Sequence, residues 1–593
     1  MLKFPVLSFL GAAALFFTAT IAAGIYGLDA ARLNLWLALG LVLALNPLGL
    51  GGQKLTAWGL CAGIAALAAV MLPARIWGVW LFAAFMAAGG MLKGFYPLAD
   101  GNTNNEAAIP YGRLIILTAA YFNLSFITNT GHTDVQYDFA SCYNYIEYIL
   151  ENDFLFWREN PLLTRPSYST YHPILHFLLA AGEMRLATVL GAEILNAGIG
   201  ADTGAGIMVS GAGIQNAELG VGAGANILLA AEAAQVCFCF YMLWYYFLAG
   251  KILRFFRLRT AVYCGALAFV CFFPAYNAIA GFFNNDCLLL PLQAGTVYYS
   301  LLYYRDGGRK NLAFILLFAT AAALTKLSGI VVLPLTGAAI LLRLWQQRQE
   351  PGNGRRLAET KNKQQKSGAE NKRQLAETAV FGGLMLAGLA IWPLYQHYFL
   401  NVGFDFVPPQ EHLSLKGYSL WKRFNPLGAL FYPQMFYNDF GINLWETMTK
   451  TALFGQWDFS MRGADIMGLI TALVLTYKAL LVLAVVAAAY LGAKKRQTQA
   501  LRQTQAFWLT MILLAGILAG QVMFGLKHPY MCNQDFRYVA IITLPVALLL
   551  AQFLDKVPET GQRVWGTLAC GAGLALIAVF AFLSAFVWWR ISF

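Results

Sequence analysis

Long apolar runs separated by short polar segments dominate the chain. Most runs reach about 18 residues with few charges, which is the length that a helix needs to cross a membrane. The expected spans are residues 6–28, 33–50, 55–73, 76–92, 112–129, 226–250, 260–281, 284–304, 311–326, 328–345, 378–399, 466–492, 507–525, 538–555 and 565–587. The pattern therefore predicts an all-α polytopic membrane protein with about fifteen transmembrane helices and interfacial helices in its outside loops.

Composition agrees with this pattern, since 59% of the 593 residues are hydrophobic and only 12% are charged. The net charge of +12 could suggest a nucleic-acid partner. The basic residues instead fall in alternate loops: Lys251, Arg254, Arg257 and Arg259; Arg305, Arg309 and Lys310; residues 348–373; and Lys494, Lys495, Arg496 and Arg502. The positive-inside rule makes these loops cytoplasmic, so no nucleic acid is expected.

Sidedness then follows for the remaining segments. Residues 130–225, 400–465 and 526–537 face the outside of the plasma (inner) membrane. The first apolar run, which follows Lys3, has two readings: a cleaved signal peptide or a retained helix, and its length of over twenty residues favours the retained helix.

Four regions are expected along the chain. Residues 1–111 form N-terminal helices, and residues 112–345 form a membrane core that includes the outside loop 130–225. Residues 346–378 are polar and charged without apolar period, which predicts a disordered cytoplasmic loop. Residues 379–593 form C-terminal membrane helices with an aromatic outside loop at 400–465.

The first outside loop carries two carboxylates, Asp134 and Asp138, one helical turn apart. Thr133 and Gln136 make a capping box, so a helix is expected to start at Asp134. Its apolar face predicts that it lies on the membrane surface. Considered by itself, Asp134 can be explained without any function, because a carboxylate at a helix start is stabilised by the helix dipole.

Other polar residues lie at the outer ends of spans and, on the predicted topology, share one membrane face with Asp134. They are His172, Asp286, Lys326, His528, Asp535 and Arg537. Lys326 and Arg537 have a structural alternative as anchors whose charged ends reach the interface. The prediction that these cations lie on the same membrane face as several carboxylates nevertheless favours a catalytic site at the outer face.

The order of these motifs resembles the GT-C superfamily of membrane glycosyltransferases. The motifs are the acidic start of the outside loop, His172-Pro-Ile-Leu-His176, Asn284-Asn285-Asp286, Leu324-Thr325-Lys326 and Phe536-Arg537-Tyr538. The chain looks closest to bacterial relatives of protein O-mannosyltransferases and of lipid A aminoarabinose transferases. The likeness covers residues 112–345 and, more loosely, the C-terminal third; residues 1–111 have no recognised counterpart.

The resemblance implies a GT-C-like bundle that transfers a sugar, with inversion, from a polyprenyl-phosphate carrier to a protein, lipid or glycan acceptor. Asp134 matches the family's catalytic aspartate, but the family often has Asp-Glu where this chain has Asp134-Val135, so Asp138 is a rival. His172 aligns although the usual His-Pro-Pro is His-Pro-Ile here. Asp286 matches a second acidic position, and Lys326 and Arg537 match basic positions near the lipid phosphate.

Physical chemistry supports the same roles. A polyprenyl phosphate is already a good leaving group, so the enzyme needs cations at its oxygens more than it needs a general acid. Lys326, Arg537 and His528 are the available donors. A carboxylate such as Asp134 would take the proton of the acceptor.

Three alternatives stay open. His172 and His176 are spaced for a divalent metal, although the Glu of an HExxH motif is absent. Cys142 and Cys532 both lie in outside segments, where a disulfide could form. A transporter or flippase for lipid-linked sugars is the competing function, but the chain shows no convincing internal repeat and its charges lie at one face.

The outside loop 400–465 is unusually aromatic. It contains Trp421, Trp445, Trp457, Tyr418, Tyr432, Tyr437, Phe431 and Phe454. These rings are expected either to cover the active site and contact a sugar or lipid, or to form an interfacial belt.

A first prediction concerns the two carboxylates. Asp134→Asn keeps the size of the side chain and removes the proton acceptor, so stability should fall by at most about 1 kcal/mol. Sugar transfer should fall by about 10²–10⁴-fold. A transfer assay on purified protein, with detergent monodispersity as the folding control, measures both. Loss of transfer in Asp138→Asn but not in Asp134→Asn would assign the catalytic base to Asp138. Full activity of both variants would show that neither carboxylate is the base.

Overall fold

The computed structural model describes residues 108–129, 139–157, 159–164, 168–196, 221–349, 360–402, 410–430, 441–455, 466–495, 501–557 and 563–592. Over these ranges the chain is helical, and the β-structure they contain is one isolated bridge between Ser414 and Tyr530. The prediction of an all-α chain is confirmed for these ranges. Asp134, Asp138 and the spans expected within residues 6–92 lie outside the described residues.

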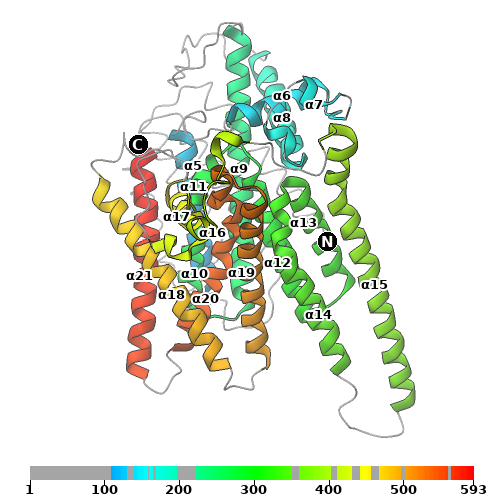
Figure 1. The fold of residues 1–593 in the computed structure, drawn as a ribbon, viewed down its shortest axis with the longest axis vertical. Coiled ribbons are helices and arrows are strands. Elements are labelled where there is room, and N and C mark those ends of the chain that lie inside the picture. Colours follow the sequence, from blue (N-terminus) through cyan, green and yellow to red (C-terminus); the bar gives the residue numbers. More distant parts are fainter. Residues whose placement is uncertain are drawn as a thin grey trace.

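Figure 1 colours the helices in chain order from blue to red. The first half contains α5 (Ala108–Asn129), α6 (Phe139–Glu151), α7 (Pro161–Thr164), η3 (Tyr168–Tyr171), α8 (Leu175–Asn196), α9 (Val221–Phe255), α10 (Thr260–Cys271), α11 (Ala275–Gly281), α12 (Asp286–Asp306), α13 (Arg309–Thr325), η4 (Leu327–Val332) and α14 (Leu333–Gln349). The second half contains α15 (Thr360–Tyr395), η5 (Gln396–Leu400), η6 (Glu411–Leu413), α16 (Leu420–Phe424), η7 (Pro426–Leu430), α17 (Leu444–Phe454), α18 (Met467–Lys495), α19 (Leu501–Lys527), η9 (Met531–Gln534), η10 (Phe536–Ile542), α20 (Thr543–Lys556) and α21 (Arg563–Ser592). The η elements are 3₁₀ turns, apart from η5, which is π-helical.

Six segments of the described chain are long and apolar enough to cross a membrane, whereas eleven of the about fifteen expected spans fall in this part of the chain, so the expected number was too high. They are Leu327–Gln346, Ala376–Leu400, Met467–Ala493, Phe507–Lys527, Met531–Lys556 and Val564–Trp588. A seventh is added if α10 and α11, which meet at a bend of 49°, count as one broken span. A helical protein with several spans is therefore the architecture of the described ranges.

Part of the difference lies in α12, which corresponds to the span expected at residues 284–304. This helix packs against α9, α13 and α14. Gln293 Nε2 of α12 donates to Ser328 O at 2.9 Å, and Ser300 Oγ lies 2.9 Å from Thr336 Oγ1. Because neighbouring helices satisfy these polar groups, α12 does not need the apolar composition of a lipid-facing span.

The basic loops lie at one end of the bundle. Figure 1 shows the end of α14, the start of α15, the end of α18 and the start of α19 at its lower end. Arg309 at the start of α13 forms an ion pair with Glu377 of α15, and Arg259 before α10 forms one with Asp555 of α20 at 3.0 Å. These ion pairs therefore join helices that are far apart in the sequence, and both involve residues of the basic loops identified in the sequence.

A break between α10 and α11 shapes the opposite end. Pro274 precedes α11 and lacks a backbone N–H, so α10 cannot continue regularly through it. A Cβ atom at Gly281 would lie 2.9 Å from the Phe126 ring of α5, so glycine permits this close approach. The break directs the chain into the short turn of residues 282–285, from which α12 starts.

The disordered loop expected at residues 346–378 differs from the structure at both ends. The helix α14 continues to Gln349, and α15 begins at Thr360. The sequence from Thr360 is rich in Lys, Gln, Glu and Ala, which favour helix, and it leads directly into an apolar span. Helix propagation from the span outward explains why a polar segment is helical here.

Cys142 and Cys532 form no disulfide with each other, because both are free thiols in the structure. Cys142 is buried and accepts a hydrogen bond from Ser169 Oγ at 3.2 Å. Cys532 Sγ donates to Gln410 Oε1 at 3.4 Å. The two thiols therefore belong to different local contacts.

The aromatic outside loop is described in part, over residues 410–430 and 441–455. Trp445 packs inward from α17, and its Nε1 donates to Phe424 O at 2.8 Å. Trp421 points outward, with 69% of its surface exposed. The rings thus serve two purposes, since some build the loop and others are presented at its surface.

A labelling experiment tests the two ends of the bundle. Cysteines introduced at the exposed positions Ala376 and Leu420 should react from opposite sides of the membrane, because a full span separates them. A membrane-impermeant maleimide should label Leu420→Cys on intact cells and Ala376→Cys only after permeabilisation. The parent protein, with its nine cysteines, gives the background. Equal labelling of both positions on intact cells would contradict this arrangement.

Candidate functional site

A buried ion pair joins the start of α12 to the end of α13. Lys326 Nζ lies 2.5 Å from Asp286 Oδ1, and the two residues are 5% and 1% exposed. Asn285 Nδ2 donates to Thr325 O at 3.0 Å, which fixes the two chain segments to each other. Because an unpaired charge at this depth would be costly, each partner requires the other.

The local backbone explains how Lys326 reaches this position. The residue is extended, with φ −160° and ψ 141°, between α13 and the 3₁₀ turn η4. Gly329 N donates to Lys326 O at 2.8 Å, and a Cβ atom at Gly329 would lie 2.5 Å from the backbone of Ala322. Glycine therefore allows η4 to fold tightly against α13.

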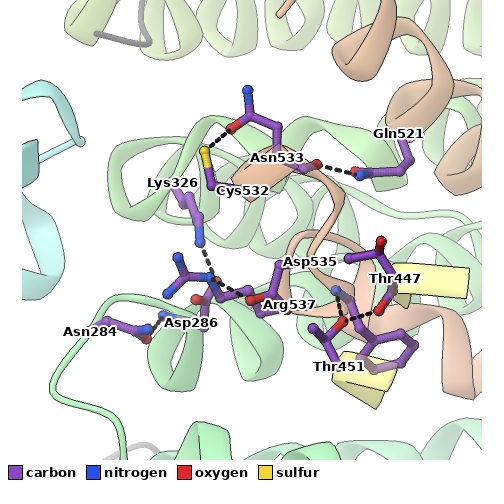
Figure 2. A network of polar contacts seen from close by, with 11 residues as sticks. Asn284, Asp286, Lys326, Thr447, Thr451, Gln521, Cys532, Asn533, Asp535 and Arg537 are labelled. Atoms are coloured by element: carbon purple, nitrogen blue, oxygen red, sulfur yellow. Dashed lines mark hydrogen bonds and ion pairs between the residues drawn. The ribbon is translucent and has the colours of Figure 1, made fainter. Parts of the chain in front are cut away.

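A second pair lies at the start of η10, where Asp535 directly precedes this turn and Arg537 is part of it. Arg537 Nε is 3.5 Å from Asp535 Oδ2, and Asp535 Oδ1 also accepts a hydrogen bond from Arg537 N at 3.0 Å. Phe536 N donates to Thr451 Oγ1 of α17 at 2.8 Å. Figure 2 shows this segment facing the Asp286–Lys326 pair, so α17 and α12 together hold the site.

The two cations share one aromatic ring. Lys326 Nζ lies 4.6 Å and Arg537 Cζ 5.5 Å from the centroid of the Tyr538 ring. A cation over an aromatic face is attracted by the ring quadrupole. Four charges therefore gather at this site, and their formal sum is zero because two carboxylates accompany two cations.

His528 joins this site through aromatic contacts. Its ring lies 5.4 Å from Phe524, and the Phe524 ring lies 5.5 Å from Tyr538. Its carbonyl accepts a hydrogen bond from Asn533 Nδ2 at 3.1 Å. The structure therefore brings Asp286, Lys326, Asp535 and Arg537 together, with His528 on their border.

The two histidines of the His-Pro-Ile-Leu-His motif occupy different surroundings. His172 is half-buried in the turn between η3 and α8, and its N donates to Ser169 O at 3.0 Å. His176 is fully buried in the first turn of α8. Within the described ranges, no group of three His, Cys, Asp or Glu side chains is arranged to hold a metal ion.

Burial controls the protonation of His176. Its desolvation and the nearby charge of Lys326 lower the pKa of His176 to about 3. The imidazole is therefore neutral at physiological pH.

The start of α6 anchors the segment that follows Asp138. Phe139 is the first described residue of this helix, and its ring lies 5.5 Å from the ring of Phe283. Phe283 belongs to the turn that leads into Asp286. The chain after Asp138 therefore meets the candidate site at this turn.

The sequence analysis missed several residues of this region. Tyr538 was read only as part of a motif, although its ring supports both cations. Glu183 of α8 was not considered; it accepts a hydrogen bond from Tyr241 Oη of α9, and its second oxygen is buried without a hydrogen-bond partner among the described residues. A glutamate that follows the apolar first turns of α8 was the available signal. Burial raises the pKa of Glu183 to about 8, against the opposing effect of the Tyr241 hydrogen bond.

Comparison with known proteins assigns no family to this geometry. No protein-family model matches the chain, and no curated protein matches it.

The raised pKa of Glu183 predicts how stability depends on pH. Below pH 4.5 the carboxyl is protonated in both states, and between pH 4.5 and about 8 only the unfolded state loses the proton. Stability should therefore fall as pH rises through this window, by up to about 1.4 kcal/mol per pH unit.

Thermal unfolding in detergent from pH 5 to pH 8 measures the effect. Glu183→Gln should flatten the slope, because it removes the titrating proton and keeps an acceptor for Tyr241. Glu411→Gln, at an exposed position, should keep the wild-type slope. An unchanged slope in Glu183→Gln would contradict a protonated Glu183.

Proposed function

We propose that the chain is an inverting glycosyltransferase that moves a sugar from a polyprenyl-phosphate carrier to an acceptor at the outer face of the plasma membrane. The observation that carries this proposal is the convergence of Lys326 and Arg537 on one ring, Tyr538, at the end of the bundle opposite the basic loops. Two cations held at one point suit a phosphate.

The charge of the donor changes in a direction that these cations favour. A phosphate esterified to both lipid and sugar carries one negative charge. When the bond between the sugar C1 and the phosphate oxygen breaks, the electron pair stays on the phosphate and a second negative charge develops. Lys326 and Arg537 therefore attract the transition state more strongly than the ground state, which is the requirement for catalysis.

The carboxylates provide the complementary functions. Asp286 and Asp535 hold the two cations in position, and a phosphate oxygen could replace one carboxylate oxygen at each cation. The acceptor oxygen or nitrogen attacks C1 from the face opposite the phosphate, and its proton passes to a carboxylate. We assign this role to Asp134, with Asp138 as the rival, and the packing of Phe139 on Phe283 supports a position of that segment near the site.

The setting of the reaction follows from charge. The positive-inside rule places the basic loops in the cytoplasm and the site at the opposite surface, where a lipid-linked sugar and a protein, lipid or glycan acceptor would meet. The exposed ring of Trp421 suits contact with membrane lipid or with an acceptor.

A transporter or flippase of lipid-linked sugars is the second candidate. The broken helix α10–α11 favours it, because transporters often bind substrates at interrupted helices. The buried charges agree with either function. Solubilised protein separates the two, since only a transferase forms a new glycosidic bond without two compartments.

Arg537 gives the most direct test of the phosphate role. Arg537→Ala should lower transfer by about 10²–10³-fold, as expected when one charged donor to a developing anion is removed. Arg537→Lys should recover part of the loss, because an ammonium group keeps the charge but not the two-point geometry. Arg309→Ala, at the basic end of the bundle, is the matched control and should retain activity.

The assay uses purified full-length protein, a polyprenyl-phosphate sugar and membrane extract as the source of acceptor. Mass spectrometry of lipids from a deletion strain complements it, since the unused donor should accumulate. Full activity of Arg537→Ala, together with unchanged lipids and glycans in the deletion strain, would exclude the proposal.

A further inference from the structure

A second set of polar groups lies beside the ion pairs, centred on His176. The ring of His176 is fully buried and packs 5.1 Å from Phe238 of α9 and 5.4 Å from Phe177. Neither ring nitrogen has a hydrogen-bond partner within the described ranges. A buried imidazole with two unsatisfied nitrogens is unusual, because most buried polar atoms are hydrogen-bonded.

Two neighbouring residues share this property. Asn284 Nδ2 and Asp286 Oδ2 are buried, and neither has a hydrogen-bond partner in the part of the chain that is described. Asn284 Oδ1 accepts from Asp286 N at 2.9 Å, as Figure 2 shows. Asp286 Oδ1 accepts a hydrogen bond from Lys326 Nζ, and the charge of Lys326 contributes, after burial, to the lowered pKa of His176.

Ring contacts connect His176 to the turn before α12, because Phe238 lies 5.1 Å from His176 and 5.3 Å from Phe283, which directly precedes Asn284. We call His176, Asn284 and Asp286 the α8 polar cluster. Among its unsatisfied atoms, Asn284 Nδ2 is a hydrogen-bond donor and Asp286 Oδ2 is an acceptor. Unsatisfied polar atoms cost free energy when buried, and several in one place indicate that a ligand supplies the missing hydrogen bonds.

The protonation of His176 selects the kind of ligand. The neutral imidazole offers one donor and one acceptor, which is the combination that a hydroxyl group requires. The aromatic rings of Phe177 and Phe238 line His176, and Phe283 packs 5.3 Å from Phe238. Hydrogen-bonding groups next to apolar walls suit a hydroxylated ring.

Charge argues against an amino sugar. An ammonium group bound at Asp286 would have to share this carboxylate with Lys326, and the two like charges would repel strongly away from water. The carboxylate of Asp286 already serves Lys326 through its other oxygen. A neutral sugar avoids this conflict.

We propose that the α8 polar cluster binds the hydroxyl groups of the donor sugar, and that this sugar is a neutral hexose or pentose and not an amino sugar. The inference rests on the proposed function, because it places the sugar next to the phosphate held by Lys326 and Arg537.

Binding of four probes to the purified full-length protein tests the inference. The probes are undecaprenyl phosphate and the same carrier bearing mannose, glucose or aminoarabinose. At least one neutral sugar should bind about tenfold more tightly than the bare carrier, a gain equivalent to one or two hydrogen bonds. Aminoarabinose should give no gain.

Variants identify the residue responsible. His176→Leu should remove the gain from the neutral sugar and leave the affinity for undecaprenyl phosphate unchanged within twofold. His176→Gln keeps a donor and an acceptor and should retain part of the gain in affinity. If His176→Leu does not fold, His176→Gln still tests whether the gain depends on the side chain at position 176. His412→Leu, at an exposed position of η6, is the matched control and should behave as wild type.

The outcomes separate the two proposals. Failure of the wild-type protein to bind undecaprenyl phosphate would overturn the proposed function and this inference with it. Binding of the carrier without any gain from mannose or glucose, a larger gain from aminoarabinose, or a full gain in His176→Leu and His176→Gln would overturn this inference alone.

Discussion

The buried ion pair between Asp286 and Lys326 is the constraint on which the candidate site depends. Two charges removed from water are tolerated only in close contact, and loss of one partner of such a pair typically costs about 3–5 kcal/mol. The contact requires α12 to begin where α13 ends. The break at Pro274 and the tight turn at Gly329 are the local features that make this arrangement possible.

The second cation, Arg537, is the reason why we propose that this ion pair belongs to a phosphate-binding site. Arg537 reaches the same ring as Lys326 from a segment more than two hundred residues further along the chain. Two cations at one ring repel each other, so the site is favourable only with anions present. Asp286 and Asp535 supply those anions in the protein alone, and a lipid phosphate is the anion that our proposed reaction would bring.

Sequence alone predicted the helical class and the segments of the six apolar spans, and it named Asp286, Lys326, Asp535 and Arg537, which the structure brings together. It did not predict their pairing, because the contact between Asp286 and Lys326 depends on how helices pack across 40 residues of chain. Hydropathy also predicted α12 as an apolar span, whereas this helix carries buried polar groups that hydrogen-bond to neighbouring helices. The contact of Tyr538 with both cations and the full burial of His176 were hidden for a related reason, since an aromatic or histidine near an apolar run has the same sequence pattern whether it is buried or exposed.

The central claim is that Lys326 and Arg537 bind the phosphate of a lipid carrier. A cryo-electron microscopy structure of the full-length protein in lipid nanodiscs with undecaprenyl phosphate tests it most directly. We expect the phosphate within hydrogen-bonding distance, about 2.7–2.9 Å, of both Lys326 Nζ and the Arg537 guanidinium, with their contacts to Asp286 and Asp535 lengthened. A carrier bound elsewhere, with both ion pairs intact, would contradict the account.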